Sequence, residues 1–430
     1  MNGAQSISLR DLLVRQVQKL AGLAVHGRVF RLYARPSPPS VSDAGRLRIA
    51  VSYLIPSLGD NVMVFPLIDA IRREHPTAEI SCFISSNNRI LSLHPGIDHF
   101  YQLPDSRSLL QKLGPAGHIL KVWKWHRNQL RNLRFDVCLV LRGGVDPFHS
   151  AHLAWLLGGR ERIGYSSQVE PERDGIDLGA DLLLTKQIKK IGAVHEVQRG
   201  GEVLKLAGLI QETVEINQTV QSMLAVAHSS AACEYISRFQ VLQRPYGIVA
   251  PGASFPRRRW ASERFAILAK EEIVACGWTP VFVGGPEDNA ACDAMAEALD
   301  VPCLNLAGKT NFAQLAGICS NAQCFIGNDS GPAHVAGACG VPTLIVTAFA
   351  KTSLETHHAS PVRSRPIGPY CAVVQPPKQL SPCTEECLAQ EPHCILQVQV
   401  DEVRDAFAQL MERRQSEIAG NRTSTPRVIL

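Results

Sequence analysis

The sequence predicts an α/β protein built from two doubly wound, Rossmann-like domains that face each other across a cleft. At 430 residues the chain is longer than one hydrophobic core usually organises. Short apolar segments alternate with helix-like segments in two separate series, the pattern that parallel sheets with crossover helices produce. In the second series each strand-like segment ends at Gly or Pro, which is typical of a sheet covered on both faces.

Composition supports two folded domains. Apolar residues make up 45% of the chain and charged residues 19%, a globular balance far from that of disordered proteins. The formal charge of +5 is spread along the chain, which weakly favours anionic ligands and counts against a dedicated nucleic-acid binder. We find no apolar run of about 18 residues and no secretory signal pattern, so we expect a cytoplasmic protein.

Residues 1–46 are expected to form an N-terminal amphipathic helix and a linker. Apolar residues recur at helical spacing over residues 6–24, with arginine and lysine on the rest of the helix surface. Such a helix packs on its own protein or on a partner subunit, or it lies on an anionic membrane surface in peripheral contact. A Pro/Ser-rich stretch over residues 36–42 follows, as in a linker.

The first domain is predicted over residues 47–225. RIAVSYLI reads as a strand, VFPLIDAIRREH as a helix and AEISCFIS as a second strand, which together make a βαβ unit. We expect an interdomain linker at 226–245 and the second domain at 246–400. A closing helix at 401–416 and a flexible tail at 417–430 complete the expected organisation.

Three strand-to-helix turns carry residues suited to ligand binding, which occurs at the carboxyl ends of strands in open α/β sheets. The first turn is Ser57–Asn61, directly after the RIAVSYLI strand. Gly59 permits a tight turn, and Asp60 lies at or near the helix N-cap with its carboxylate facing the cleft. Simple helix capping by Asp60 is the alternative interpretation.

The second turn is Pro251–Ser254, which precedes Arg257, Arg258 and Arg259. Its small residues allow a phosphate to approach closely, Ser254 can donate a hydrogen bond, and the arginines supply positive charge for a diphosphate. A solvated basic loop is the alternative.

In the third turn a strand ends at Asp329 and a helix begins with Ser330, Gly331 and Pro332. Exposed amides at a helix N-terminus form an anion site, although a purely structural turn uses the same residues. Between these turns, Glu287 and Asp288 follow another strand end. Their carboxylates could accept hydrogen bonds from ribose hydroxyls or cap the next helix.

Several catalytic and cofactor motifs are absent from the sequence. Neither Gly143-Gly144 nor Gly284-Gly285 belongs to a GxGxxG motif, which removes the main support for a dinucleotide-dependent oxidoreductase. The Ala307–Thr310 segment mimics the end of a Walker A loop, but Cys303 occupies the position of the leading glycine. There is no HExxH and no GxSxG.

Taken in order, these segments resemble glycosyltransferase family 9, the heptosyltransferase family. The resemblance covers about residues 47 to 405 and rests on SLGDNVMVFPLIDAIRREHP, PGAS with RRRWASERFAILA, FVGGPED, NLAGKTNFAQLAGICSNAQCFIGNDSGPAHVAGACGVPTLIV and the late cysteine-rich segment. GNDSGPAH, which ends at His334, is the most specific of these motifs.

The resemblance implies an inverting, metal-independent enzyme of the GT-B fold with no cofactor. Members typically transfer heptose from ADP-L-glycero-D-manno-heptose to the inner core of lipopolysaccharide, so a lipid-linked or cell-envelope glycan acceptor at the cytoplasmic membrane face is expected, and no nucleic acid. By resemblance Asp60 is the general base, and Arg258 or a neighbouring arginine contacts the donor diphosphate. Asp329, Ser330 and Gly331 match the donor-binding motif.

Two departures from the family, and a cluster of late cysteines, leave alternatives open. The N-terminal extension allows membrane association or oligomerisation, and the arginine cluster replaces a more familiar lysine. Unliganded thiols are the favoured interpretation of Cys371, Cys383, Cys387 and Cys394, which have His393 beside them; a metal or a disulfide is the alternative. Related transferases that heptosylate proteins carry cysteine-bound iron. A protein-heptosylating transferase with a bound metal, and a non-catalytic sugar-nucleotide-binding assembly protein, are therefore the competing functions.

Overall fold

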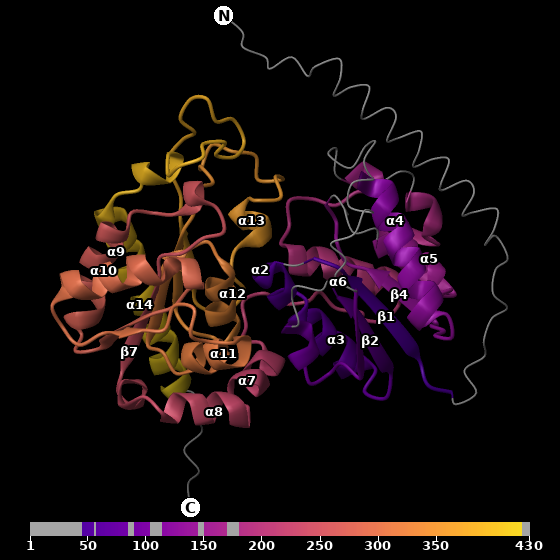
Figure 1. Ribbon diagram of the computed structural model, residues 1–430, viewed down its shortest axis with the longest axis horizontal. Coiled ribbons are helices and arrows are strands. Elements are labelled where there is room, and N and C mark those ends of the chain that lie inside the picture. The colour runs from indigo at the N-terminus through magenta and orange to yellow at the C-terminus, as the bar shows by residue number, and fades with distance from the viewer. Residues whose placement is uncertain are drawn as a thin grey trace, which may run out of the picture.

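The computed structural model describes residues 45–55, 57–84, 90–103, 114–144, 150–169 and 180–423. It contains two parallel six-stranded sheets side by side, each covered by helices (Figure 1). The predicted α/β class with two doubly wound halves is confirmed. The expectations for the N-terminal helix at 6–24, for the linker stretch at 36–42 and for the end of the tail at 424–430 lie outside the described residues.

The first sheet contains six parallel strands in the order β3-β2-β1-β4-β5-β6. The strands are β1 (Arg48–Tyr53), β2 (Glu79–Ile84), β3 (His99–Gln102), β4 (Val137–Val140), β5 (Glu161–Tyr165) and β6 (Lys186–Ile188). Chain order reverses between β1 and β4, which is the topological switch point of a doubly wound sheet. The main helices of this half are α2 (Leu58–Val62), α3 (Phe65–Glu74), α4 (Gly114–Trp125), α5 (Ser150–Leu156) and α6 (Glu196–Leu206).

The second sheet has the order β12-β11-β10-β7-β8-β9 and repeats the same topology, with its switch point between β7 and β10. The strands are β7 (Tyr246–Ala250), β8 (Thr279–Phe282), β9 (Leu304–Asn305), β10 (Cys324–Asn328), β11 (Thr343–Val346) and β12 (Cys371–Val374). Its helices include α9 (Ser262–Leu268), α10 (Asn289–Leu299), α11 (Phe312–Ser320), α12 (Gly331–Ala338) and α13 (Pro361–Ser364).

The central strands are buried along their length, as their apolar sequences predict. Every residue of β7 and of β10 is buried, because helices cover both faces of a parallel sheet. The largest buried cluster joins side chains of the first half, such as Ile49 and Phe65, to side chains of the second, such as Ile248 and Phe325. The two halves therefore pack directly against each other.

The segment predicted as a linker at 226–245 is largely helical. It contains the end of α7 (Gln221–Ala227), α8 (Ser230–Ser237) and the 3-10 turn η7 (Gln240–Gln243), and both α helices pack on α11 of the second half. Gly317 of α11 permits this close approach, because a Cβ there would lie 2.9 Å from Ala232 Cβ. The connection is thus helical and packs on the second half.

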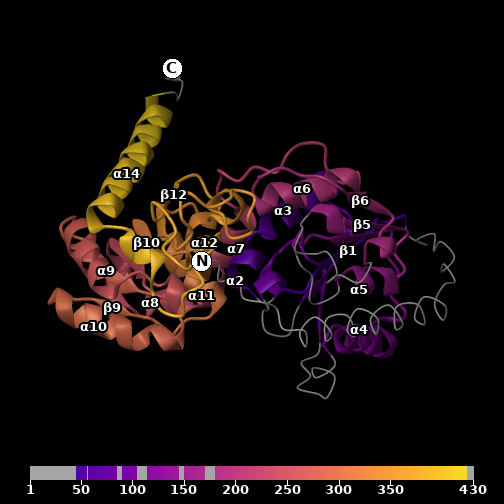
Figure 2. The same ribbon diagram turned by 90° about the horizontal axis from the view of Figure 1, so that it is seen from above.

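The last helix, α14 (Val400–Thr423), extends beyond its expected end at residue 416. Val403, Phe407 and Leu410 recur at helical spacing and are buried against the second half, where α14 contacts α9, β11 and β12. Its later turns project away from the molecule (Figure 2). None of the helices in the described part of the chain is both long and apolar enough to cross a membrane.

Candidate active site

A cleft of about 230 Å³ lies where the two halves meet, and residues of both halves line it. The turns after β1, β4, β7 and β10 all contribute, so the switch points of the two sheets open onto the same space. The structure brings eight of the sequence-predicted residues to this cleft: Gly59, Asp60, Ser254, Arg258, Asp329, Ser330, Gly331 and His334.

Asp60 lies in the first turn of α2, directly after β1. The N-cap of this helix is Ser57, whose hydroxyl oxygen accepts a hydrogen bond from the Asp60 backbone N–H at 3.5 Å. The Asn61 amide donates to the carbonyls of Ile55 at 2.8 Å and Ser57 at 2.6 Å, which fixes the turn. Ser57 therefore caps the helix, and Asp60 lines the cleft.

Gly59 and Gly331 allow α2 of the first half to touch α12 of the second. A Cβ on Gly59 would lie 2.7 Å from His334 Cδ2, and one on Gly331 would lie 2.3 Å from Leu58 Cδ2. Figures 1 and 2 both place α2 and α12 at the junction of the halves. The sequence predicts a tight turn at Gly59, and this prediction is wrong, because Gly59 lies inside helix α2. The absence of a side chain at Gly59 leaves room for the His334 ring.

The turn after β10 is held by the buried side chain of Asn328. The Asn328 side-chain amide donates to the Pro251 carbonyl at 2.6 Å, and its side-chain oxygen accepts the backbone N–H of Trp260 at 3.0 Å. These two hydrogen bonds connect the turns after β7 and β10. Ser330 is the N-cap of α12, yet its buried hydroxyl has no hydrogen-bond partner among the described residues. Buried polar atoms are rarely left unpaired, so Ser330 Oγ is suited to receive a ligand.

His334 is buried in α12 beside this turn. Burial lowers the pKa of His334 below its ordinary value, an effect that the nearby Asp329 and Asp60 carboxylates oppose. Its Nε2 lies 4.0 Å from Asp329 Oδ1. His334 is therefore neutral at neutral pH and contributes packing between the halves without adding charge to the cleft.

The three consecutive arginines have three different positions. Arg258 lines the cleft. Arg257 borders a smaller adjoining cavity and lies over the Phe255 ring, 4.4 Å from its centroid. Arg259 donates to the Ala253 carbonyl at 3.1 Å and pairs with Asp288 at 3.4 Å. Among these three arginines, Arg258 is the one placed to contact a ligand in the cleft.

Glu287, Asp288 and Pro332 are not among the residues that line the cleft. Asp288 is 5% exposed and accepts the Gly285 N–H at 2.9 Å, so its carboxylate turns into its own loop. Burial raises the pKa of Asp288, and the Gly285 hydrogen bond and Arg259 oppose that rise. Glu287 is exposed beside it, and Pro332 occupies the first turn of α12.

Comparison with known proteins agrees with this architecture. A family model described as glycosyltransferase family 9 (heptosyltransferase) matches residues 123–391, more than half of the chain. The chain belongs to glycosyltransferase family 9. It is therefore an enzyme of the transferase class, as the sequence predicts.

Relatives of this glycosyltransferase include two heptosyltransferases of Escherichia coli. It is 25% identical over 295 residues to lipopolysaccharide heptosyltransferase 3, covering 66% of this chain and 79% of that protein. It is 26% identical over 296 residues to lipopolysaccharide heptosyltransferase 2 of strain K12, covering 66% and 78%.

Solved structures show the same fold. The family 9 glycosyltransferase of Veillonella parvula has a TM-score of 0.61 and 19% identity, covering 85% of this chain and 98% of its own. E. coli heptosyltransferase WaaC with ADP has a TM-score of 0.59 and 16% identity, covering 85% and 100%. The predicted GT-B architecture is confirmed.

Sequence reasoning missed Arg142, Glu196 and Arg363, which also line the cleft of this glycosyltransferase. Arg142 lies two residues after the end of β4, so its position near a strand end at the switch point was the available signal. Glu196 opens α6 in the first half, and Arg363 lies in α13 of the second. Arg363 Nε donates to Glu196 Oε1 at 2.7 Å, which joins the halves beside the cleft. No local motif marks this pair, because its members are far apart in sequence.

Proposed function

We propose that this enzyme transfers heptose from ADP-heptose to an acceptor in the lipopolysaccharide core, with inversion at the anomeric carbon and without a divalent ion. The carrying observation is that Asp60 of the first half shares one cleft with Arg258 and Ser330 of the second. The names of the relatives, and the ADP and ADP-2-deoxy-2-fluoro heptose in the WaaC structures, support the proposed acceptor and donor.

The first half supplies the base in this mechanism. The acceptor hydroxyl oxygen attacks the anomeric carbon while the bond from that carbon to the diphosphate oxygen breaks. The Asp60 carboxylate accepts the hydroxyl proton as the new glycosidic bond forms. A single displacement from the face opposite the leaving group inverts the configuration.

The second half stabilises the leaving ADP. Arg258 supplies a fixed positive charge, and Ser330 supplies a buried hydroxyl at the N-terminus of α12. First-turn amides and the helix dipole stabilise an anion at such a terminus. Donors aimed at the charge that develops on the leaving group lower the barrier to transfer. We assign to these groups the charge neutralisation that a divalent ion provides in other phosphate-transferring sites.

Replacement of Asp60 by Asn tests the proposed base. We expect kcat with ADP-heptose and a purified core acceptor to fall by about 10²–10⁴-fold, since Asn has nearly the same shape and cannot accept the proton. Calorimetric titration should give an ADP Kd within roughly threefold of the wild-type value, because Asp60 acts on the acceptor side. Product is measured by mass spectrometry.

Glu74→Gln is the matched control, since Glu74 is an exposed carboxylate of the same half outside the cleft, and its kcat should be unchanged. An Asp60→Asn enzyme that keeps more than about a tenth of the wild-type kcat would remove Asp60 as the base. Tight ADP-heptose binding by the wild-type chain with no transfer to any core acceptor would favour the assembly-protein alternative.

A further inference from the structure

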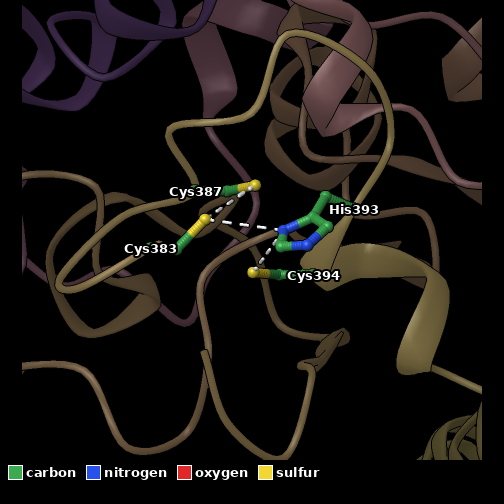
Figure 3. Close-up of side chains that lie close together, drawn as sticks. All are labelled: Cys383, Cys387, His393 and Cys394. Carbon is green, nitrogen blue, oxygen red and sulfur yellow. Dashed lines mark hydrogen bonds between the residues drawn. The ribbon is translucent and has the colours of Figure 1, made fainter. Parts of the chain in front are cut away.

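Three cysteines and one histidine converge in the loop that follows β12. The side chains of Cys383, Cys387, His393 and Cys394 point toward a common centre (Figure 3). The Cys383 and Cys387 sulfurs are 3.7 Å apart, and His393 Nδ1 lies 3.5 Å from the sulfurs of both Cys383 and Cys394. All four candidate ligand atoms lie within 4.8 Å of one another.

These separations are those of the edges of a zinc tetrahedron. Zinc bonds of about 2.3 Å to sulfur and about 2.05 Å to nitrogen place neighbouring ligands about 3.8 Å apart for two sulfurs and about 3.6 Å apart for sulfur and nitrogen. A disulfide would bring two sulfurs to about 2.05 Å, far closer than the pair at 3.7 Å. We propose that Cys383, Cys387, His393 and Cys394 bind a structural zinc ion.

The surroundings of the four residues suit a closed structural site. The three cysteines are buried, and two of the sulfurs accept backbone hydrogen bonds: Cys383 from the Leu388 N–H at 3.3 Å and Cys394 from the Leu380 N–H at 3.4 Å. Such bonds orient thiolate ligands and offset their negative charge. On binding, the thiols release their protons to solvent, and three Zn–S bonds and one Zn–N bond form.

The loop that contains the four residues has no regular secondary structure before Cys394. Residues 375–393 contain neither helix nor strand, which is long for an ordered connection in a compact domain. A metal joining residues 383, 387, 393 and 394 closes this loop at its centre. Ligand binding of this kind contributes directly to the folding free energy of the segment that it closes.

The zinc site would hold in place the segment that carries the three arginines at 257–259. The 3-10 turn η11 (Cys394–Gln397) begins at a zinc ligand and packs on the turn η8 (Pro256–Arg258). Trp260 Nε1 donates to the Val398 carbonyl at 3.0 Å, and Arg264 Nη1 donates to the Leu396 carbonyl at 2.9 Å. The ion therefore acts as a positioning element for Arg258, a consequence that rests on the proposed function, whereas the metal site does not.

Cys371 does not belong to this cluster and provides a control. It lies on β12, where its sulfur would be 3.2 Å from a Cβ on Gly337. Of the four late cysteines singled out from the sequence, Cys371 is thus not a proposed ligand, and His393 is the fourth ligand instead. Substitution of Cys371 removes a thiol from the same region without removing a proposed ligand.

The test uses the full chain purified without a polyhistidine tag. Mass spectrometric elemental analysis should find about one zinc per chain, and replacement by Co²⁺ should give the intense visible bands of a tetrahedral thiolate site. Cys387→Ser and His393→Ala should each reduce bound zinc by roughly tenfold or more at the same free zinc concentration. Cys371→Ser should retain it. The two wild-type measurements hold even if a ligand variant fails to fold.

Less than about a tenth of an equivalent of zinc, with no cobalt spectrum, would overturn the proposal, as would equal loss of zinc from Cys371→Ser. Iron in place of zinc would overturn the choice of ion. Removal of zinc by a chelator should weaken ADP binding by roughly tenfold if Arg258 is displaced. One equivalent of zinc in a chain that transfers no sugar would refute the proposed function and support the metal site.

Discussion

Two turns of the second sheet look alike in sequence and differ in structure. Asp329–Gly331 follows β10, and Gly284–Asp288 follows β8; each combines glycine with an acidic residue before a helix. The first turn, Asp329–Gly331, lies at the switch point between β7 and β10 and opens onto the cleft; it is called the open turn below. The second, Gly284–Asp288, lies on the other side of β7, and the Asp288 carboxylate accepts the Gly285 N–H within it; it is called the closed turn. Position relative to the switch point, more than composition, separates the turn that opens onto the cleft from the turn that does not.

The glycines of the two turns also make room for different partners. A Cβ on Gly284 would lie 2.6 Å from Asp288 Oδ2, and one on Gly252, in the neighbouring turn after β7, would lie 2.0 Å from the same atom, so both glycines admit a carboxylate of the same half. Gly331 instead admits Leu58 of the other half. The closed turn thereby ties together the loops after β7 and β8, and the open turn ties one half of the enzyme to the other.

The largest test of this contrast is Asp288→Ala. We expect the free energy of unfolding to fall by about 2–3 kcal/mol, because the variant loses the Gly285 hydrogen bond and leaves Arg259 without its carboxylate. ADP affinity should stay within roughly threefold, since Asp288 does not line the cleft. Urea unfolding and calorimetric titration measure the two quantities, and Asp288→Asn should recover part of the stability. Lost ADP binding with unchanged stability would make the closed turn a ligand site, as ribose recognition by Glu287 and Asp288 requires.

The corresponding change in the open turn is Ser330→Ala, and its effects should be reversed. Loss of a hydroxyl that donates to the diphosphate should weaken ADP binding by roughly 5–10-fold, or about 1–1.5 kcal/mol. The free energy of unfolding should not fall, because Ser330 Oγ has no partner within the described residues.

Ser360→Ala is the control for the open turn, since Ser360 is also an N-cap serine but its hydroxyl accepts the Val362 N–H at 3.2 Å. That variant should lose about 1 kcal/mol of stability. If Ser330→Ala is destabilised equally and still binds ADP normally, Ser330 is an ordinary cap and the distinction between the turns fails.

The fold and much of the site were predictable because both depend on local sequence. Alternating strand-like and helix-like segments predicted the two sheets, and three polar strand-end turns predicted Asp60, Arg258 and Ser330 as cleft residues. Asp288 was ambiguous because capping and ligand binding use the same residue types at the same place in a helix. The Arg363–Glu196 pair could not be predicted from the sequence, because its two residues meet only when the two halves pack together. Likewise, His393 becomes a candidate zinc ligand only when the loop brings its Nδ1 beside two sulfurs.

The smallest predicted difference between the two turns concerns acid. Burial lowers the pKa of His334 at the open turn, so as pH falls through about 6.5 the unfolded chain takes up a proton first and the free energy of unfolding decreases. Burial raises the pKa of Asp288 at the closed turn. The folded protein there takes up a proton first, and its free energy of unfolding increases as pH falls toward about 3.8.

Each of these contributions is worth about 1.4 kcal/mol for every tenfold difference between the acid dissociation constants of the folded and unfolded states. His334→Gln should therefore lose less stability than the wild type between about pH 7 and 5, and Asp288→Asn should lose more between about pH 5 and 4. Urea unfolding of the three proteins across this range provides the measurement. His195 is a further buried histidine: burial lowers its pKa to about 4, and nearby His334 contributes to that lowering, so proton uptake by His195 is part of the His334→Gln comparison. Parallel pH profiles for the wild type and His334→Gln would show that the open turn does not bury a neutral histidine, and the contrast between the turns would then rest on ligand binding alone.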